Sequence, residues 1–167
     1  MILIGLGANM PHPDYGDPVN TLGEAVHRLR KIVHVSRQSS WYRSAPVPIS
    51  DQPWFVNAVL VVETEMSEID LLQALHRTER EFGRVRRQRW EARVLDLDLL
   101  AYHDLVTENQ DQAAGPVLPH PHMQGRAFVL APISEIAPEW RHPISRLRAS
   151  ELLKILPSEQ PFDVVGV

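Results

Sequence analysis

A run of alternating acidic and apolar residues constrains the fold of this chain more than any other feature. Residues 93–100 read R-V-L-D-L-D-L-L. Because successive side chains of a β-strand point to opposite faces, the run predicts a strand with Asp96 and Asp98 on one face and leucines on the other. The two carboxylates would lie about 7 Å apart along the strand and would repel each other in an apolar surrounding. We therefore expect a cationic group between or above them.

The residues upstream of this run supply cations of one kind. Seven of the 17 Lys and Arg residues are arginines that lie between Arg77 and Arg93, and arginine offers planar, bidentate donors to phosphate. Mg²⁺ is a second kind, since it binds one or two carboxylates together with phosphate oxygens. A solvated edge strand whose aspartates pair with nearby arginines explains the alternation equally well. The residues alone leave these readings open.

Length and composition limit the class of protein. A chain of 167 residues predicts one domain over residues 1–167. It contains no cysteine, which excludes disulfides and thiolate metal sites and fits a cytoplasmic protein. The net charge of −4 argues against a nucleic-acid partner. Residues 1–6 are apolar but lack a basic flank and are too short to cross a bilayer, so we expect neither a signal peptide nor a membrane partner.

The order of the predicted elements indicates the fold class. Strands are predicted over residues 1–6, 33–42, 54–63 and 94–102. One helix is expected from Pro18, after Asp17 as N-cap, and a second from a Ser67 cap to Phe82. Residues 43–53 contain three prolines and predict a loop. The resulting order β-α-β-β-α-β is that of an α+β, ferredoxin-like sandwich. Its antiparallel sheet would carry helices on one face and leave the other for loops, a ligand and C-terminal additions that include helices at 128–136 and 149–156.

Two polar residues interrupt apolar patterns. Glu79 falls within the apolar stripe of the second helix, where a carboxylate needs a partner. It could pair with a local arginine near the helix end, or it could orient a phosphate-binding arginine. Asn57 interrupts an apolar strand on the same face as Phe55. It could bond sheet or loop backbone, or it could offer its amide to a flat heterocycle that stacks against Phe55.

Two further motifs have weaker implications. His120 lies between two prolines and, with Arg126, could contact a phosphate or a nucleotide, although a turn histidine bonded to backbone is commoner. Gly5-Leu6-Gly7 lacks the third glycine of a dinucleotide-binding fingerprint, so we reject that interpretation.

Several segments carry a resemblance to a known family. They read G-L-G-A-N at 5–9, Y-R-S-A-P-V at 42–47, Q-P-W-F-V-N-A-V at 52–59, E-R-E-F-G-R-V-R at 79–86, R-W-E-A-R-V-L-D-L-D-L-L at 89–100, and L-P-H-P-H-M-Q-G-R-A-F-V-L at 118–130. In this order they resemble 6-hydroxymethyl-7,8-dihydropterin pyrophosphokinase of folate biosynthesis. The resemblance implies transfer of the β,γ-diphosphate of ATP to the hydroxymethyl group of the dihydropterin, with release of AMP. ATP and this pterin would be the partners of a monomeric enzyme.

The resemblance also implies roles for individual residues. Asp96 and Asp98 would hold two Mg²⁺ ions, with Arg84 and Arg93 as further catalytic residues. The implied ATP contacts are Glu79, Arg84, Arg86, Trp90, Arg93, His120 and Arg126, of which Arg86 and Trp90 would lie on a mobile loop. The pterin would lie between Phe55 and Phe128, with Asn57 bonding its edge and backbone near Ser44 and Val47 assisting.

Two rival classes are a metal-dependent nuclease and a ferredoxin-like RNA-binding module. An RNA module would need exposed sheet aromatics in an RNP-type motif and a basic surface, neither of which this sequence has. A nuclease would need a long basic groove. The net charge of −4 argues against such a groove.

Overall fold

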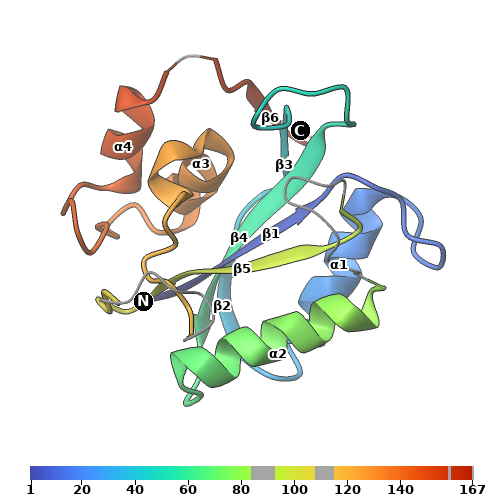
Figure 1. Ribbon diagram of the computed structural model, residues 1–167, viewed down its shortest axis with the longest axis horizontal. Helices are drawn as coiled ribbons and strands as arrows, with labels where there is room; N and C mark the ends of the chain where they lie inside the picture. Colours follow the sequence, from blue (N-terminus) through green and yellow to red (C-terminus); the bar gives the residue numbers. More distant parts are fainter. Residues whose placement is uncertain (84–92, 108–114, 158, 167) are drawn as a thin grey trace.

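The computed structural model describes residues 1–83, 93–107, 115–157 and 159–166 (Figure 1). In chain order its main elements are β1 (Ile2–Ala8), α1 (Pro18–Leu29), β2 (His34–Gln38), β3 (Tyr42–Ser44), β4 (Phe55–Glu63), α2 (Glu68–Glu81), β5 (Asp96–Tyr102), the 3₁₀ turn η2 (Met123–Gly125), α3 (Ala127–Ile136), α4 (Ala149–Ile155) and β6 (Phe162–Val164).

All six strands form one antiparallel sheet. Its order is β5-β1-β4-β3-β6, and β2 pairs with β4 beside this path. Strand β1 lies between β4 and β5 and is antiparallel to both. The central strands β1 and β4 are buried along most of their length, which explains why their sequences are apolar without alternation. The predicted α+β, ferredoxin-like arrangement is confirmed.

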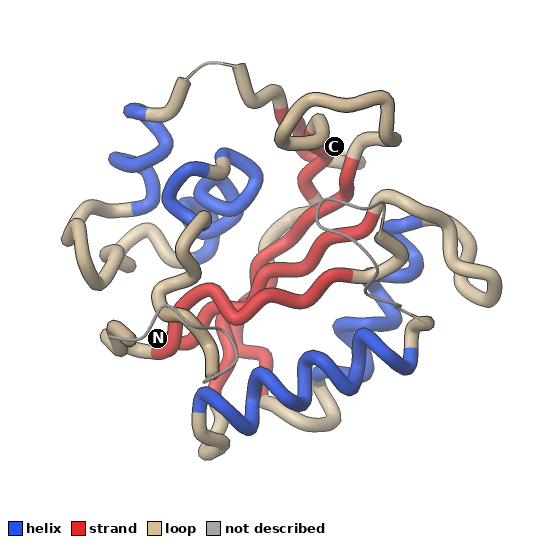
Figure 2. The backbone as a smooth tube through the Cα atoms, in the orientation of Figure 1, coloured by secondary structure: helices blue, strands red, loops and turns tan. Residues whose placement is uncertain are grey.

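Helices cover both faces of the sheet and create two separate cores (Figures 1 and 2). On one face, α1 and α2 bury their apolar stripes against Leu97 and Leu99 of β5. On the other face, α3 and α4 pack against Leu3 of β1 and Leu100 of β5. The predicted alternation is confirmed for residues 96–100, although β5 begins at Asp96 and not at residue 94, and it leaves the aspartates of β5 on the α3 face.

The helix boundaries follow the predicted capping signals. Asp17 Oδ1 accepts a hydrogen bond from the Asn20 N–H at 2.9 Å, and Ser67 Oγ accepts one from the Asp70 N–H at 3.1 Å. After α2, Gly83 has φ of +76°, a conformation that glycine adopts without steric cost. None of the described helices has both the length and the apolar character needed to cross a bilayer.

Two short strands differ from the sequence-based expectation. The segment predicted as one strand at 33–42 is divided into β2 and β3, and residues 43 and 44, predicted as loop, belong to β3. Strand β6 was not predicted. Strand β3 lies between β4 and β6 and pairs with both, so the register comes from tertiary neighbours and three residues carry too little local signal to reveal it.

Candidate active site

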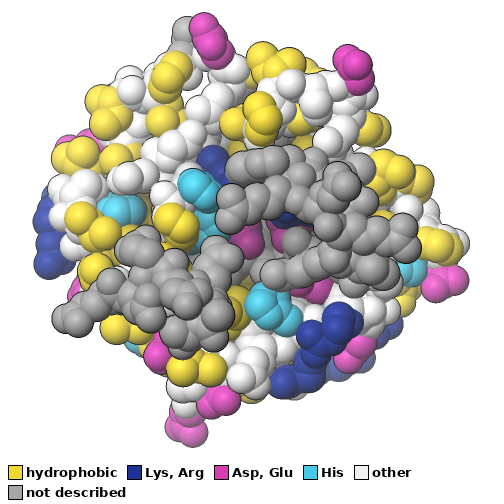
Figure 3. All heavy atoms as spheres, in the orientation of Figure 1, with side chains coloured by type: hydrophobic (Ala, Val, Ile, Leu, Met, Phe, Trp, Pro, Cys, Tyr) yellow, Lys and Arg dark blue, Asp and Glu magenta, His cyan; other side chains and the backbone are white. Residues whose placement is uncertain are grey.

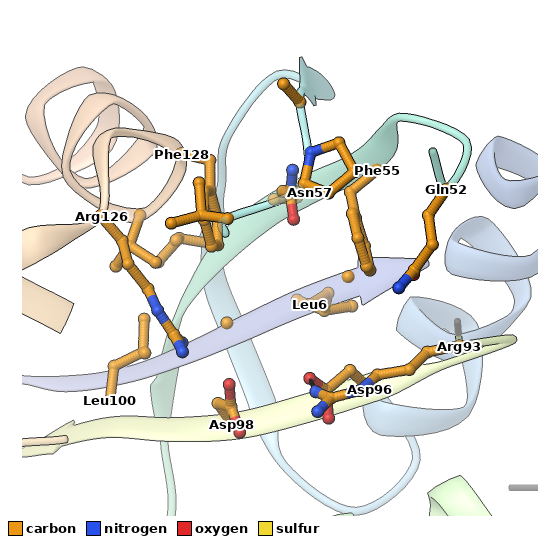
Figure 4. A pocket seen from close by; sticks show the side chains of 18 of the residues that line it. Leu6, Gln52, Phe55, Asn57, Arg93, Asp96, Asp98, Leu100, Arg126 and Phe128 are labelled. Atoms are coloured by element: carbon orange, nitrogen blue, oxygen red, sulfur yellow. Dashed lines mark hydrogen bonds and ion pairs between the residues drawn. The ribbon is translucent and has the colours of Figure 1, made fainter. Parts of the chain in front are cut away.

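A pocket opens between the α3 face of the sheet and the start of α3 (Figure 4). Eight of the predicted site residues line it: Val47, Phe55, Asn57, Arg93, Asp96, Asp98, Arg126 and Phe128. They come from β4, β5 and the residues just before it, the loop after β3 and the start of α3, segments that are far apart in the sequence. The fold therefore brings together residues that, in the sequence, only the resemblance to a known family had placed in one site.

Glycines of β1 form the floor of this pocket. A Cβ atom at Gly7 would lie 3.2 Å from Asn57 Oδ1, and one at Gly5 would lie 3.2 Å from Leu100 Cδ1. Side chains at these positions would intrude on the residues that face the pocket. No role was expected for these glycines from the sequence. The signal in the sequence was that the two glycines are two residues apart in a predicted strand, which places both on the same face of the sheet.

The carboxylates lie at one end of the pocket, between two arginines. Arg93 forms an ion pair with Asp96, and Arg126 extends from the opposite side toward Asp98 (Figure 4). Withdrawal from water and the charge of Asp96 raise the pKa of Asp98 to about 7, against the opposing effect of both arginines. Burial lowers the pKa of Arg126, while both aspartates act to raise it. The expected cationic neighbours of the aspartates are therefore present as arginines.

The chemistry of this donor set also fits a divalent cation. Asp98 has a raised pKa beside a second carboxylate, and both side chains face the pocket. A cation there would favour the charged form of both groups. Within the described ranges, no cluster of three or more His, Asp or Glu side chains could hold a metal ion by itself. Two carboxylates that leave coordination positions for water and phosphate are what Mg²⁺ prefers.

The opposite end of the pocket combines aromatic rings with an amide. Phe55 and Phe128 line it. Asn57 is only 5% exposed, and its Nδ2 donates to Ser44 Oγ at 2.9 Å and to the Tyr42 carbonyl at 3.5 Å. Asn57 thus bonds the neighbouring strand and also borders the pocket, so the structure combines both alternatives that the sequence left open.

Two predicted ATP contacts, Glu79 and His120, do not line this pocket in the described part of the chain. Glu79 is 2% exposed and accepts a hydrogen bond from the Leu97 N–H at 2.8 Å. The backbone N–H of His120 donates to the Leu100 carbonyl at 2.8 Å. Burial, together with the neighbouring Arg126 and His122, lowers the pKa of His120 to about 4, so its imidazole is neutral at pH 7. In the face of the molecule that Figure 3 shows, acidic side chains (magenta) and histidine side chains (cyan) lie close together near the centre.

Asn9, for which no role was expected from the sequence, connects three segments around the site. Its Oδ1 accepts from the Arg93 N–H at 2.7 Å. Its Nδ2 donates to Gln52 Oε1 at 3.2 Å and to the Pro53 carbonyl at 3.1 Å. Asn9 is 3% exposed. In the sequence, its place soon after an apolar predicted strand was the available signal.

Three predicted ATP contacts, Arg84, Arg86 and Trp90, lie outside the described residues, as does the loop predicted around them. Their assignment stays a prediction.

Comparison with known proteins identifies the family. The sequence model described as 7,8-dihydro-6-hydroxymethylpterin-pyrophosphokinase (HPPK) matches residues 3–138. The chain belongs to the HPPK family. It is therefore a pyrophosphokinase of folate biosynthesis, and the nuclease and RNA-binding alternatives are rejected.

Individual HPPK proteins support this membership. A Haemophilus influenzae protein named 2-amino-4-hydroxy-6-hydroxymethyldihydropteridine pyrophosphokinase is 39% identical over 153 residues, which cover 90% of this chain and 89% of the relative. A Synechocystis protein of the same name is 38% identical over 154 residues, which cover 91% and 74%. The crystal structure of wild-type Plasmodium falciparum HPPK-DHPS superposes with a TM-score of 0.69 at 12% identity. This match covers 92% of our chain but only 44% of the longer Plasmodium chain, and it supports the fold alone.

Proposed function

We propose that this pyrophosphokinase transfers the β,γ-diphosphate of ATP to the hydroxymethyl group of 6-hydroxymethyl-7,8-dihydropterin and releases AMP. The observation that carries the proposal is the composition of the pocket. One end has aromatic rings and a buried amide, and the other has two carboxylates between two arginines. Each end matches the chemistry of one substrate.

The aromatic end suits the pterin. Phe55 and Phe128 can contact the flat ring, and Asn57 can hydrogen-bond its edge. The bond from Asn57 Nδ2 to Ser44 Oγ keeps the amide in one orientation, so little side-chain entropy remains to be lost on binding. Backbone near Val47 borders the same space and offers further polar groups.

The charged end suits the phosphates of ATP. Asp96 and Asp98 would hold Mg²⁺, with two ions expected, and bound Mg²⁺ would neutralise phosphate charge and lower the pKa of the attacking alcohol. Arg93 and Arg126 are placed to donate to phosphate oxygens. Neutral His120 does not line the pocket and is assigned to ATP by resemblance. Glu79 would support the ATP site through the backbone of β5, and Arg84, Arg86 and Trp90 are assigned to ATP by resemblance.

The reaction requires positioning and charge neutralisation. The alcohol oxygen attacks the β-phosphorus, the bond from that phosphorus to the α-phosphate oxygen breaks, and AMP leaves. Alignment of these atoms and compensation of the developing charge supply most of the acceleration in phosphoryl transfer. A rigid sheet that carries the carboxylates on β5 and the amide on β4 provides such alignment.

The test is to measure AMP formed from ATP and Mg²⁺ with and without the pterin. We expect AMP only when the pterin is present, and loss of the activity when a chelator removes Mg²⁺. Formation of ADP in place of AMP, or AMP formation that is independent of the pterin, would contradict the proposal. A cytoplasmic location and a monomeric state stay predictions.

A further inference from the structure

A residue near the C-terminus, Gln160, makes two hydrogen bonds to the backbone around Arg126. Its Oε1 accepts from the Ala127 N–H at 2.9 Å, and its Nε2 donates to the Gly125 carbonyl at 2.9 Å. These two backbone groups immediately precede and follow Arg126. A single hydrogen bond would let the backbone rotate about it, whereas two bonds to one planar amide fix both position and orientation.

The start of α3 depends on this contact. Arg126 is the N-cap residue of α3, and its side chain makes no capping hydrogen bond. The first N–H groups of a helix have no partner within the helix. Gln160 supplies one for Ala127, although 33 residues separate the two in sequence. The guanidinium of Arg126 has only donors and cannot cap the Ala127 N–H itself, and it extends into the pocket (Figure 4).

The placement of Arg126 matters because of what surrounds it. Its guanidinium carbon lies 5.7 Å from the centre of the Phe128 ring, and both residues line the pocket. Asp98 and Asp96 attract the same guanidinium. A shift of the backbone at Arg126 would therefore move a cation relative to both carboxylates and would move an aromatic wall of the pocket.

The residues after Gln160 continue to the opposite wall of the pocket. The Pro161 carbonyl accepts from the Ala45 N–H at 3.3 Å. Phe162 then pairs with Ser44 in the β3–β6 ladder. Farther along, Asp163 accepts two hydrogen bonds from Arg43, at 3.1 and 2.8 Å. Residues 160–164 thus connect the backbone of Arg126 to the strand that holds Ser44.

We propose that Gln160 is a positioning residue for diphosphoryl transfer, which it assists by fixing the backbone of Arg126. This inference rests on the proposed function, because it assigns Arg126 a contact with the phosphates of ATP. A purely structural role, in which Gln160 only caps α3, would predict lower stability with unchanged catalysis by the folded enzyme.

The experiment compares three variants of the full chain. Gln160→Leu removes both hydrogen bonds at similar volume. Gln160→Glu keeps an acceptor for the Ala127 N–H but loses the donor to the Gly125 carbonyl. Asp163→Asn is the matched control, because it weakens the ion pair of the same C-terminal segment with Arg43 and leaves the Gln160 contact in place. The kcat, the KM for ATP and the thermal midpoint are measured for each variant.

We expect Gln160→Leu to lower kcat by between about 10- and 100-fold, the scale for a small misplacement of a positioned group. Gln160→Glu should show a smaller loss, and Asp163→Asn should keep the wild-type kcat. In the Arg126→Ala background, Gln160→Leu should cause little further loss, because residues that act through one group are not additive. A wild-type kcat in Gln160→Leu, or an equal fold-loss in both backgrounds, would overturn the inference.

Two further measurements keep the test decisive. If Gln160→Leu does not fold, Gln160→Glu retains the helix cap and is compared with Asp163→Asn instead. If activity in the Arg126→Ala background is too low to measure, the affinity for the α,β-methylene analogue of ATP replaces kcat in the comparison. Failure of the wild-type enzyme to form AMP with the pterin would instead reject the proposed function itself.

Discussion

Glu79 Oε1 accepts a hydrogen bond from the backbone N–H of Leu97 at 2.8 Å. Leu97 separates Asp96 from Asp98, and β5 is at the edge of the sheet. The carboxylate of α2 therefore bonds an edge-strand N–H that no strand among the described residues pairs. This contact joins the helix layer to the strand segment that spaces the two aspartates.

The contact predicts losses of different size for two substitutions at Glu79. Glu79→Leu should lower the free energy of unfolding by about 1–3 kcal/mol, because it leaves the buried Leu97 N–H without this acceptor. Glu79→Gln keeps an acceptor oxygen and should cost less. Denaturant unfolding of both variants measures the difference. Equal losses would mean that the charge of Glu79, and not the hydrogen bond to Leu97, sets its contribution.

Replacement of either pocket aspartate should impair catalysis and leave the fold intact. We expect Asp96→Asn or Asp98→Asn to reduce turnover at saturating Mg²⁺ by at least about 10²-fold, the scale for loss of a preorganised electrostatic group. The thermal midpoint of Asp98→Asn should not fall, since the change removes a like-charge repulsion, whereas Asp96→Asn also loses the ion pair with Arg93 and should lower it slightly. Exposed Asp104 provides the control, and Asp104→Asn should retain activity. Near-wild-type turnover in either pocket variant would refute the metal assignment.

The amide end of the pocket predicts selective loss of pterin binding. Asn57→Ala should weaken pterin binding by about 1–3 kcal/mol, the cost of leaving polar groups unpaired, and should affect an ATP analogue far less. Gly7→Ala should act in the same direction, because its methyl group would lie 3.2 Å from Asn57 Oδ1. Calorimetry with each ligand separately tests both variants, with exposed Asn20→Ala as control. The pocket assignment fails if both ligands lose affinity equally.

Buried His142 predicts a pH dependence of stability. Burial lowers the pKa of His142 below its ordinary value of 6.5, so the folded state disfavours the protonated form. The unfolded chain then binds more protons, and the free energy of unfolding should fall as the pH drops through about 6.5 toward the folded-state pKa. His142→Asn can still accept from the Ser145 N–H, which lies 3.3 Å from Nδ1. Unfolding measured between pH 7 and 5 should show a shallower slope for this variant; an unchanged slope would contradict the prediction.

Much of the fold followed from local patterns. The caps at Asp17 and Ser67 are set by side-chain to backbone bonds within a few residues, and the alternation at 93–100 fixes which side chains share a face of β5. These features depend only on residues that are close together in the sequence. The short strands β3 and β6 could not be predicted in this way, because their pairing partners are distant in sequence.

The sequence by itself determined the order of the main elements, the common face of Asp96 and Asp98, and, through its motifs, the family. Only the tertiary structure decided that Glu79 bonds the backbone of β5, that Gly7 opens the floor of the pocket beside Asn57, and that Gln160 holds the backbone of Arg126. The physical reason is the range of the interactions. Periodicity and capping act over a few residues, whereas a hydrogen bond between distant segments exists only after packing has brought its donor and acceptor together.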